Sequence, residues 1–335
     1  MNVADKTIRH VAREANVSVT TVSRVMNGSA KVSNATREKV LEAAEKLQFT
    51  PSRAAIALVT KRTRTIGLVV PYLDNSIFSS MIHEIEQTLS QLDYFLVIAV
   101  SNNNLQEETA SADRLLAMGA EGLILSGADH DAGLLARIRA RNIPVIFTSV
   151  WDEAAEHPTI GYDNFGLAQM AIRHLEELGH RNIAVLHGPI DRSDRTRERL
   201  RGLVEGKSDP TTLLFFEGEV SAEAGARGTR RALESTPRPT AAIGLSDIIA
   251  LGAIFEANRQ KLTLPGDLSI MGFDNLEWSE ECCPRLTTLA LPTRKMANAA
   301  AKAIVAKIED DQPIAPIRFD GHLIVRESTA PASTV

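Results

Sequence analysis

From Thr65 onward, apolar runs of strand length alternate with amphipathic segments of helix length. The runs fall into two series: 65–71, 94–100, 121–127 and 143–149, then 181–189, 212–218, 241–246 and 267–274. Such alternation with short turns predicts parallel sheets covered by helices. Two series therefore predict a two-lobed α/β core over residues 65–335. We expect one lobe from about 65–161 and 292–320, and the other from about 162–291 and 321–330.

A shared cleft is the expected binding site of this core. In open parallel sheets, ligands bind beyond the carboxyl ends of the strands. The segment TIGYDNF (159–165) is expected to cross from the first lobe to the second, and the segment that follows LTTLALP is expected to cross back. The carboxyl ends of both sets of strands would then face one cleft.

Residues 16–28 read NVSVTTVSRVMNG, and they have the pattern of a short helix after a tight turn. Val22 and Val25 share a buried side if the helix runs from about Val19 to Met26. Ser18 is a candidate N-cap. The preceding segment, 7–15, has an apolar stripe of its own at Ile8, Val11, Ala12 and Ala15. Two short helices across a turn predict a helix-turn-helix.

A third helix is expected from Asn34 to Leu47, with Ser33 as its cap and Val40, Leu41, Ala44 and Leu47 facing inward. It would complete a three-helix head over residues 1–50. The segment 51–64 begins with Pro51, is rich in alanine and ends in a basic tract. We interpret it as a linker with helical propensity.

Charge is distributed unevenly along the chain, whose net charge is −5. Residues 1–64 hold 12 Lys and Arg against five acids, a charge of +7, and the remainder holds 25 bases against 37 acids, a charge of −12. Because phosphate contacts supply most sequence-independent affinity for DNA, a basic head on an acidic body indicates a polyanionic partner for the head.

The sequence has no apolar run of 18 residues and no signal-peptide pattern at its start, so we expect a cytoplasmic protein with no membrane partner. The only cysteines, Cys282 and Cys283, are neighbours and are interpreted as two inert thiols in a reduced compartment. The histidines show no metal-ligand spacing, and we expect neither a metal site nor a cofactor.

Several segments, in this order, resemble the LacI/GalR family of bacterial transcription repressors: TIRHVAREANVSVTTVSRVMNG, TPSRAAIALV, GYDNFG, GHRNIAVLHGP, LSIMGFDN and PRLTTL. The resemblance covers essentially the whole chain. It implies a homodimer in which each head reads half of a pseudo-palindromic, double-stranded operator. It also implies a core similar to periplasmic binding proteins that binds a small-molecule effector.

The resemblance also implies which residues contact DNA. Base contacts fall on Val19, Thr20 and Arg24, and phosphate or packing roles fall on Ser18, Thr21, Ser23 and Asn27. Arg24 could bind both acceptors of a guanine, worth about 1–3 kcal/mol of discrimination. Val19 offers only methyl contact, and simple helix packing is the alternative for it.

The linker corresponds by resemblance to a hinge helix that folds on DNA. Its leucine, Leu58, would wedge into the minor groove, and Ala55 would lie where two hinge helices approach each other. Ile56 departs from the family, which often has arginine at this position. A passive tether is the alternative interpretation of the segment.

Effector contacts are implied at Arg199 and Asp274, a guanidinium and a carboxylate that together could hold vicinal hydroxyls or, through the arginine, an acid group. A surface ion pair of Arg199 with Glu198 or Glu205 is the alternative. The remaining candidates are Arg197, which belongs to the same loop, Ile77 and Phe78 as apolar cover, and Asp247, which is more simply a helix cap.

Two departures from the sugar-binding members bear on the effector. Ser149 stands where many of them carry an aspartate, and Val220 where many carry an aromatic residue. The loop before Leu200 also carries four arginines, Arg192, Arg195, Arg197 and Arg199. Fewer acids and more arginines favour an anionic effector, a sugar acid or a sugar phosphate, over a neutral sugar, unless several of these arginines face solvent.

An enzyme and a transport-type binding protein are the competing functions on such a scaffold. The sequence has no GxSxG, no GxGxxG after a strand, no P-loop and no HExxH. A transport protein would need a signal peptide and would not need a basic head. A ligand-responsive transcriptional regulator is therefore the expected function, and a soluble small-molecule-binding protein or an enzyme is the alternative.

Overall fold

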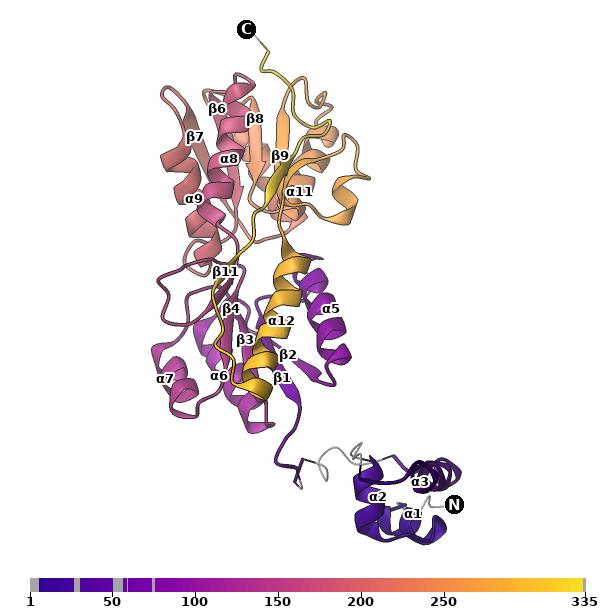
Figure 1. Ribbon diagram of the computed structural model, residues 1–335. Helices are drawn as coiled ribbons and strands as arrows, with labels where there is room; N and C mark the ends of the chain where they lie inside the picture. The colour runs from indigo at the N-terminus through magenta and orange to yellow at the C-terminus, as the bar shows by residue number, and fades with distance from the viewer. Residues whose placement is uncertain (1–5, 27–30, 51–56, 59, 74–75, 334–335) are drawn as a thin grey trace. The chain divides into compact units, whose positions relative to one another are not determined.

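The computed structural model describes residues 6–26, 31–50, 57–58, 60–73 and 76–333. Its internal contacts divide the chain into two units, Met1–Arg64 and Thr65–Val335 (Figure 1). We call them the head and the core and describe each by itself.

The head contains three helices, α1 (Ile8–Glu14), α2 (Val19–Met26) and α3 (Asn34–Lys46). Its small core combines valines and alanines from all three: Val11, Ala12, Ala15, Val22, Val25, Val40, Ala43 and Ala44. Ser18 begins α2, since its Oγ accepts the Thr21 N–H at 3.0 Å. The prediction for Leu41 was wrong, because this side chain is 50% exposed. It follows Val40 by one residue, which turns it about 100° away from the buried face.

The first sheet of the core has the order β11-β5-β4-β3-β1-β2, and all its pairs are parallel. Its strands are β1 (Thr65–Val70), β2 (Phe95–Val100), β3 (Gly122–Ser126), β4 (Val145–Thr148), β5 (Thr159–Gly161) and β11 (Ile317–Arg318). Helices α5 (Ser76–Gln91) and α12 (Thr293–Asp310) pack together on one face. Helices α6 (Leu105–Ala117) and α7 (Ala132–Ala140) cover the other.

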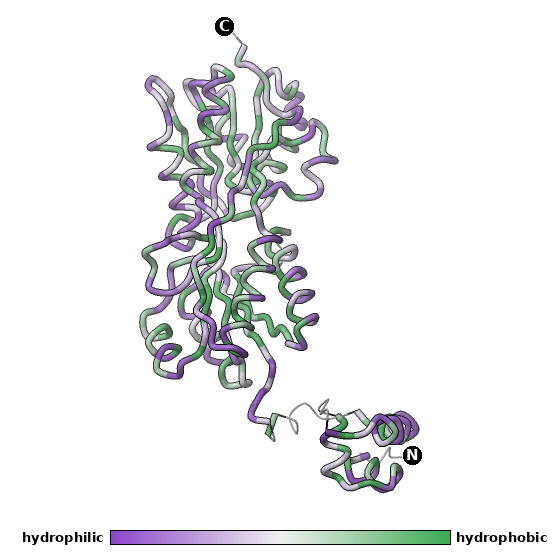
Figure 2. Tube along the Cα trace, in the orientation of Figure 1, coloured by the Kyte–Doolittle hydropathy of each residue, from purple (hydrophilic) through white to green (hydrophobic). Residues whose placement is uncertain are grey.

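The second sheet has the order β12-β10-β9-β8-β6-β7. Its strands are β6 (Asn182–His187), β7 (Thr212–Glu217), β8 (Ala241–Gly244), β9 (Ser269–Asp274), β10 (Thr287–Ala290) and β12 (His322–Ile324), and a short 3-10 helix, η1 (Glu277–Ser279), follows β9. Helices α8 (Asn164–Glu177) and α9 (Asp194–Gly206) cover one face, and α10 (Ala222–Leu233) and α11 (Asp247–Arg259) cover the other. Hydrophobic residues gather along the strands of both sheets (Figure 2).

These sheets confirm the predicted two-lobed α/β core with parallel strands. The chain passes between the sheets after β5, after β10, and again between β11 and β12. The antiparallel pairing of β10 with β12 was not predicted, because β12 is only three residues long and has no clear apolar pattern. Within the described residues, none of the helices has both the length and the hydropathy needed to cross a bilayer.

Candidate functional site

A cavity lies where the carboxyl ends of the strands from both sheets meet. The first lobe contributes Pro71 and Tyr72 after β1, Ile77, Phe78 and Met81 from α5, Asn103 after β2 and Ser149 after β4. The second lobe contributes Ser193, Arg195, Thr196 and Arg199 at the start of α9, Val220 after β7, Leu245 and Ser246 after β8, and Asp274 at the end of β9. A cavity at this place is what two parallel sheets with facing strand ends predict.

Arg199 is buried in the wall of this cavity, with 8% of its surface exposed. Its Nε donates to Asn164 Oδ1 at 2.9 Å and its Nη1 to the Leu245 carbonyl at 2.8 Å. The guanidinium lies over the Phe273 ring, 4.4 Å from the centroid. Arg199 is therefore held by the interior of the second lobe and is not part of a surface ion pair with Glu198 or Glu205.

Asp274 is the acidic partner of Arg199 in the cavity wall. Its Oδ1 lies 3.9 Å from Arg199 Nη1, and its Oδ2 accepts the Ser246 hydroxyl at 2.8 Å. Burial raises the pKa of Asp274 to about 6, although the Arg199 charge and the Ser246 bond oppose the shift. One guanidinium and one carboxylate thus lie side by side at the edge of the cavity, as the sequence led us to expect.

Asp247 does not line the cavity and does not cap its own helix. It is the first residue of α11, after the N-cap Ser246, and it is fully buried. Its carboxylate accepts the Leu276 N–H at 2.9 Å and the hydroxyls of Ser279 and Thr288, both at 2.6 Å. The side chain therefore connects the start of α11 to the turn after β9 and to strand β10.

Burial and the nearby Asp274 charge raise the pKa of Asp247 to about 7. An acid with a raised pKa in the folded state keeps its proton at a pH where the unfolded chain has lost it, so its contribution to stability falls as the pH rises. For Asp247 and Asp274 this fall extends from about pH 4 to about pH 7.

We expect the change Asp247→Asn to remove much of this dependence. The free energy of unfolding of the wild type, measured relative to the variant, should fall by on the order of 1–2 kcal/mol between pH 5 and pH 8. Urea titrations of both proteins across that range measure it. Three histidines with lowered pKa values, His157, His174 and His180, make stability rise with pH. They are present in both proteins, so their contribution cancels in the difference. A constant difference between the two proteins would contradict the assignment.

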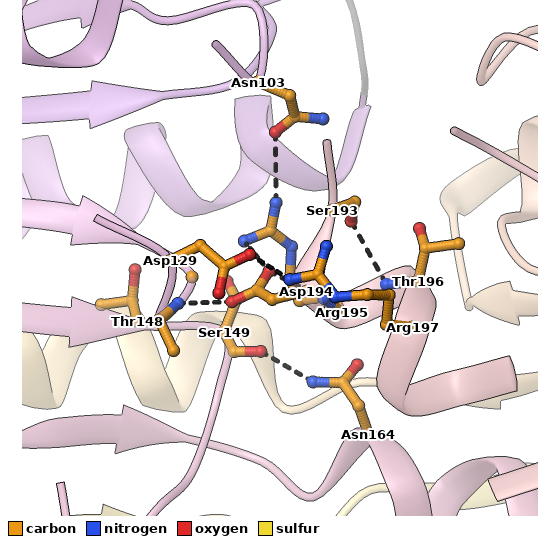
Figure 3. Close-up of polar contacts among 12 residues, drawn as sticks. Asn103, Asp129, Thr148, Ser149, Asn164, Ser193, Asp194, Arg195, Thr196 and Arg197 are labelled. Carbon is orange, nitrogen blue, oxygen red and sulfur yellow. Dashed lines mark hydrogen bonds and ion pairs between the residues drawn. The ribbon is translucent and has the colours of Figure 1, made fainter. Parts of the chain in front are cut away.

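Arg195 lies one turn before Arg199 and lines the same cavity, whereas the prediction from the sequence names Arg197 and not Arg195. Its Nη2 donates to Asn103 Oδ1 of the first lobe at 3.4 Å (Figure 3). Its Nη1 lies 3.2 Å from Asp194 Oδ1, yet this buried nitrogen has no aligned hydrogen-bond acceptor among the described residues. A buried donor without an acceptor is costly, and a ligand oxygen could satisfy it.

Asp194 connects α9 to the turn after β3 in the first lobe. Its carboxylate accepts the backbone N–H groups of Ala128 and Arg195. Burial favours the neutral acid, but the Arg195 charge and these two N–H groups hold the pKa of Asp194 below its ordinary value. The close contact of α9 with the turn after β3 requires a glycine at position 127. A Cβ there would lie 2.5 Å from Arg195 Nη1.

Arg197 points away from the cavity. Its Nη1 donates to the Ile190 carbonyl at 2.8 Å, and its Nη2 pairs with Asp129 of the first lobe (Figure 3). The reason is helical geometry, since Arg195 and Arg199 are four residues apart and share a face of α9, whereas Arg197 is two residues from each. That spacing was the signal in the sequence that could have identified Arg195.

The other predicted effector contacts lie in the cavity wall, where a ligand could reach them. Ile77, Phe78, Ser149 and Val220 all contribute to its wall. Ser149 has a positive φ of 66° and donates its N–H to Met296 Sδ at 3.1 Å. Its hydroxyl and the Val220 side chain provide neither a carboxylate nor a ring. Tyr72, Asn103, Tyr162, Ser193 and Thr196 also line the cavity and were not predicted.

In the head, the candidate DNA contacts lie mostly on the outside of α2. Ser18, Val19, Thr20 and Arg24 are exposed, with Val19 at 42%, and Thr21 and Ser23 are half-buried. Exposure of a valine beside buried Val22 and Val25 argues against simple packing of Val19. Leu58 is 85% exposed. Asn27 and Ala55 lie outside the described residues.

Comparisons with known proteins agree with both units. Residues 7–52 match the family described as bacterial regulatory proteins, lacI family, and residues 172–329 match a periplasmic binding protein-like domain. The chain is 30% identical to the catabolite control protein A of Priestia megaterium, over 91% of this chain and 92% of that protein. It is 32% identical to the HTH-type transcriptional repressor PurR of Escherichia fergusonii, over 97% of each.

Two solved structures extend the similarity to three dimensions. The Lac repressor dimer bound to operator and the anti-inducer ONPF has a TM-score of 0.87 and 28% identity, covering 97% of this chain and 99% of that one. The complex of the transcriptional regulator CelR with cellobiose has a TM-score of 0.69 and 28% identity, covering 97% of this chain and 100% of that one.

Proposed function

The chain belongs to the LacI family of bacterial regulatory proteins, and from this premise we propose that it represses transcription in the cytoplasm as a homodimer on a pseudo-palindromic operator. We further propose that a sugar acid or a sugar phosphate in the cavity controls it. The relatives named above are transcriptional regulators, which points away from an enzyme.

Support for the DNA contacts comes from the surface of α2. Small hydroxyl side chains and one arginine lie outside the valine stripe of this helix. Hydroxyls bond phosphate oxygens without bulk, and an arginine reaches both acceptors of guanine in the major groove. In this proposal Arg24, Thr20 and Val19 contact bases, whereas Ser18, Thr21, Ser23 and Asn27 contact phosphates or hold the helix.

Support for an anionic effector comes from a buried guanidinium donor in the cavity wall, although Arg195 and Arg199 each have an acidic partner, Asp194 and Asp274. Two buried arginines, Arg195 and Arg199, line the cavity together with the carboxylate of Asp274. The buried Nη1 of Arg195, which lacks an aligned acceptor among the described residues, carries the argument. An acid or phosphate oxygen of the ligand would accept from it, while Asp274 and the neighbouring hydroxyls would bind the ligand's own hydroxyls.

The change Arg195→Gln tests this effector class. Loss of a charge-assisted bond costs about 1.5–3 kcal/mol, so the response to an acidic effector should weaken by about tenfold or more. The response to neutral sugars should change little. Operator binding, followed by fluorescence anisotropy, is measured against a panel of neutral sugars, sugar acids and sugar phosphates.

Arg192→Gln is the matched control for this experiment, because Arg192 carries the same charge three residues earlier, in the loop before α9, but does not line the cavity. It should leave the responses of the wild type in place. A wild type that responds only to neutral sugars would contradict the proposed effector class.

A further inference from the structure

A groove beside the cavity lies at the N-terminus of α12. Its wall is formed by the turn after β9, the residues that join β10 to α12, and the segment between β11 and β12. It shares Ile77, Asp274 and Thr293 with the cavity. Because its other residues are not part of the cavity, a second ligand could bind here.

The first turn of α12 has N–H donors for which the described residues provide no acceptor. This helix is 18 residues long. Its N-cap is Pro292, and no described side chain accepts a hydrogen bond from its first turn. The bond from Met296 N–H to the Pro292 carbonyl, at 3.0 Å, is the first of the helix, so the N–H groups of Thr293, Arg294 and Lys295 precede it. Such N–H groups and the helix dipole together attract an anion.

Thr293 adds an independent observation. Only 6% of its surface is exposed, and its Oγ1 has no hydrogen-bond partner among the described residues. This residue lines both the groove and the cavity. A buried hydroxyl at the start of a helix, beside free N–H donors, is ready to donate to a ligand oxygen.

The charges of the first turn have the opposite sign from those that stabilise a helix start. The turn holds no acidic residue, and the exposed Arg294 and Lys295 lie on it. Positive charges at the positive end of the helix dipole are destabilising unless an anion binds between them. His322 lies in the same groove and could add a further donor.

Most of the carboxylates of the groove are paired with cations and so repel such an anion less. Asp274 is turned towards Arg199, and Asp320 lies 3.6 Å from Arg318 Nε. Glu277 is the third acidic residue of the groove, and it is exposed on η1. Two of the three acidic charges therefore have cationic partners outside the first turn of α12.

We propose that the N-terminus of α12 binds the phosphate or carboxylate group of a small anionic metabolite, at a second site next to the effector cavity. The N–H groups of the first turn and the Thr293 hydroxyl donate to the anion, and Arg294 and Lys295 neutralise it. This site goes beyond the proposed effector function, and its test requires neither operator DNA nor a sugar.

The test is a calorimetric titration of the full-length protein with inorganic phosphate, at an ionic strength held constant with sodium chloride. The wild type should bind phosphate, and the double variant Arg294→Gln, Lys295→Gln should bind it at least tenfold more weakly. Thr293→Val, which keeps the shape of the side chain and removes its hydroxyl, should also weaken binding. Lys302→Gln, on an exposed residue of the same helix, should bind as the wild type does.

Lys295→Glu gives a second, independent readout. A carboxylate in the first turn of α12 replaces the anion, so this variant should have a higher Tm than the wild type without phosphate and should gain nothing when phosphate is added. Acetate separates the two ligand classes. Weaker binding of acetate than of phosphate would indicate a phosphate group, and equal binding a carboxylate. Absence of heat with both anions, or equal weakening by Lys302→Gln, would overturn the proposal.

Discussion

Replacing Arg199 with alanine is expected to displace the effector dose-response by tenfold or more, while operator affinity without effector stays near that of the wild type. A ligand changes DNA binding only through its different affinity for two states of the protein, so losing a ligand contact changes the response and spares the head. Removal of one charge-assisted bond, about 1.5–3 kcal/mol, gives the expected displacement.

The surroundings of Arg199 make a second variant necessary. Alanine leaves Asp274 buried without its cationic partner and leaves Asn164 Oδ1 and the Leu245 carbonyl without their donor. Breaking a buried pair in this way costs about 3–5 kcal/mol of stability. Arg199→Lys keeps a positive charge near Asp274 but loses the planar, two-pronged donor geometry of the guanidinium. This variant should therefore be more stable than Arg199→Ala and should retain part of the effector response.

The measurement is an operator titration by fluorescence anisotropy at several effector concentrations, preceded by thermal denaturation of each variant. Wild type, Arg199→Ala, Arg199→Lys and Asp274→Ala are compared. Effector curves that are identical in the wild type and both alanine variants would show that the effector binds elsewhere.

Leu58→Ala is expected to weaken binding to the operator by more than tenfold and to leave binding to random DNA almost unchanged. Leu58 is 85% exposed, so its truncation should cost the free protein little stability. We propose, from the family resemblance, that in the operator complex this side chain is buried between base steps of bent DNA, where a leucine gains about 1.5–3 kcal/mol from burial alone. Basic side chains, which act on any duplex, are unaffected.

Leu41→Ala serves as the matched control, because Leu41 is also an exposed leucine of the head, at 50%, but lies on α3. Both variants are titrated with operator and with a scrambled duplex over a range of salt concentrations. Leu58→Ala should keep the salt dependence of the wild type, since no phosphate contact is lost. Equal losses on the two duplexes would refute the wedge.

The sequence predicts the helices of the head and the longer strands of the core because their patterns are local. Valines at helical spacing around residues 17–25 marked α2, and Ser18 marked its start. The apolar runs after Thr65 marked the longer strands, and their alternation with helices implied parallel sheets, since parallel strands need a crossover helix. Short strands such as β11 and β12 were missed because two or three residues carry no periodic signal.

The candidate site was predicted only in part. Arg199 and Asp274 were selected because a resemblance covering the whole chain located them, and Arg195 was available from its spacing of four residues to Arg199. The prediction of Arg197 is wrong for the cavity, because Arg197 and Arg199 are two residues apart and do not share a face of α9. Asp247 was interpreted as a cap because a polar residue at the start of a helix usually is one.

Only the tertiary structure decided which side chains meet. Asp247 lies near Asp274 because α11 packs over β9. This packing brings together two acidic residues that are 27 positions apart in the chain. Arg195 reaches Asn103, and Asp194 reaches Ala128, because α9 of one lobe docks on turns of the other. Local propensity depends on neighbours within a few residues, whereas burial, pKa and unsatisfied donors depend on what the whole fold brings into contact.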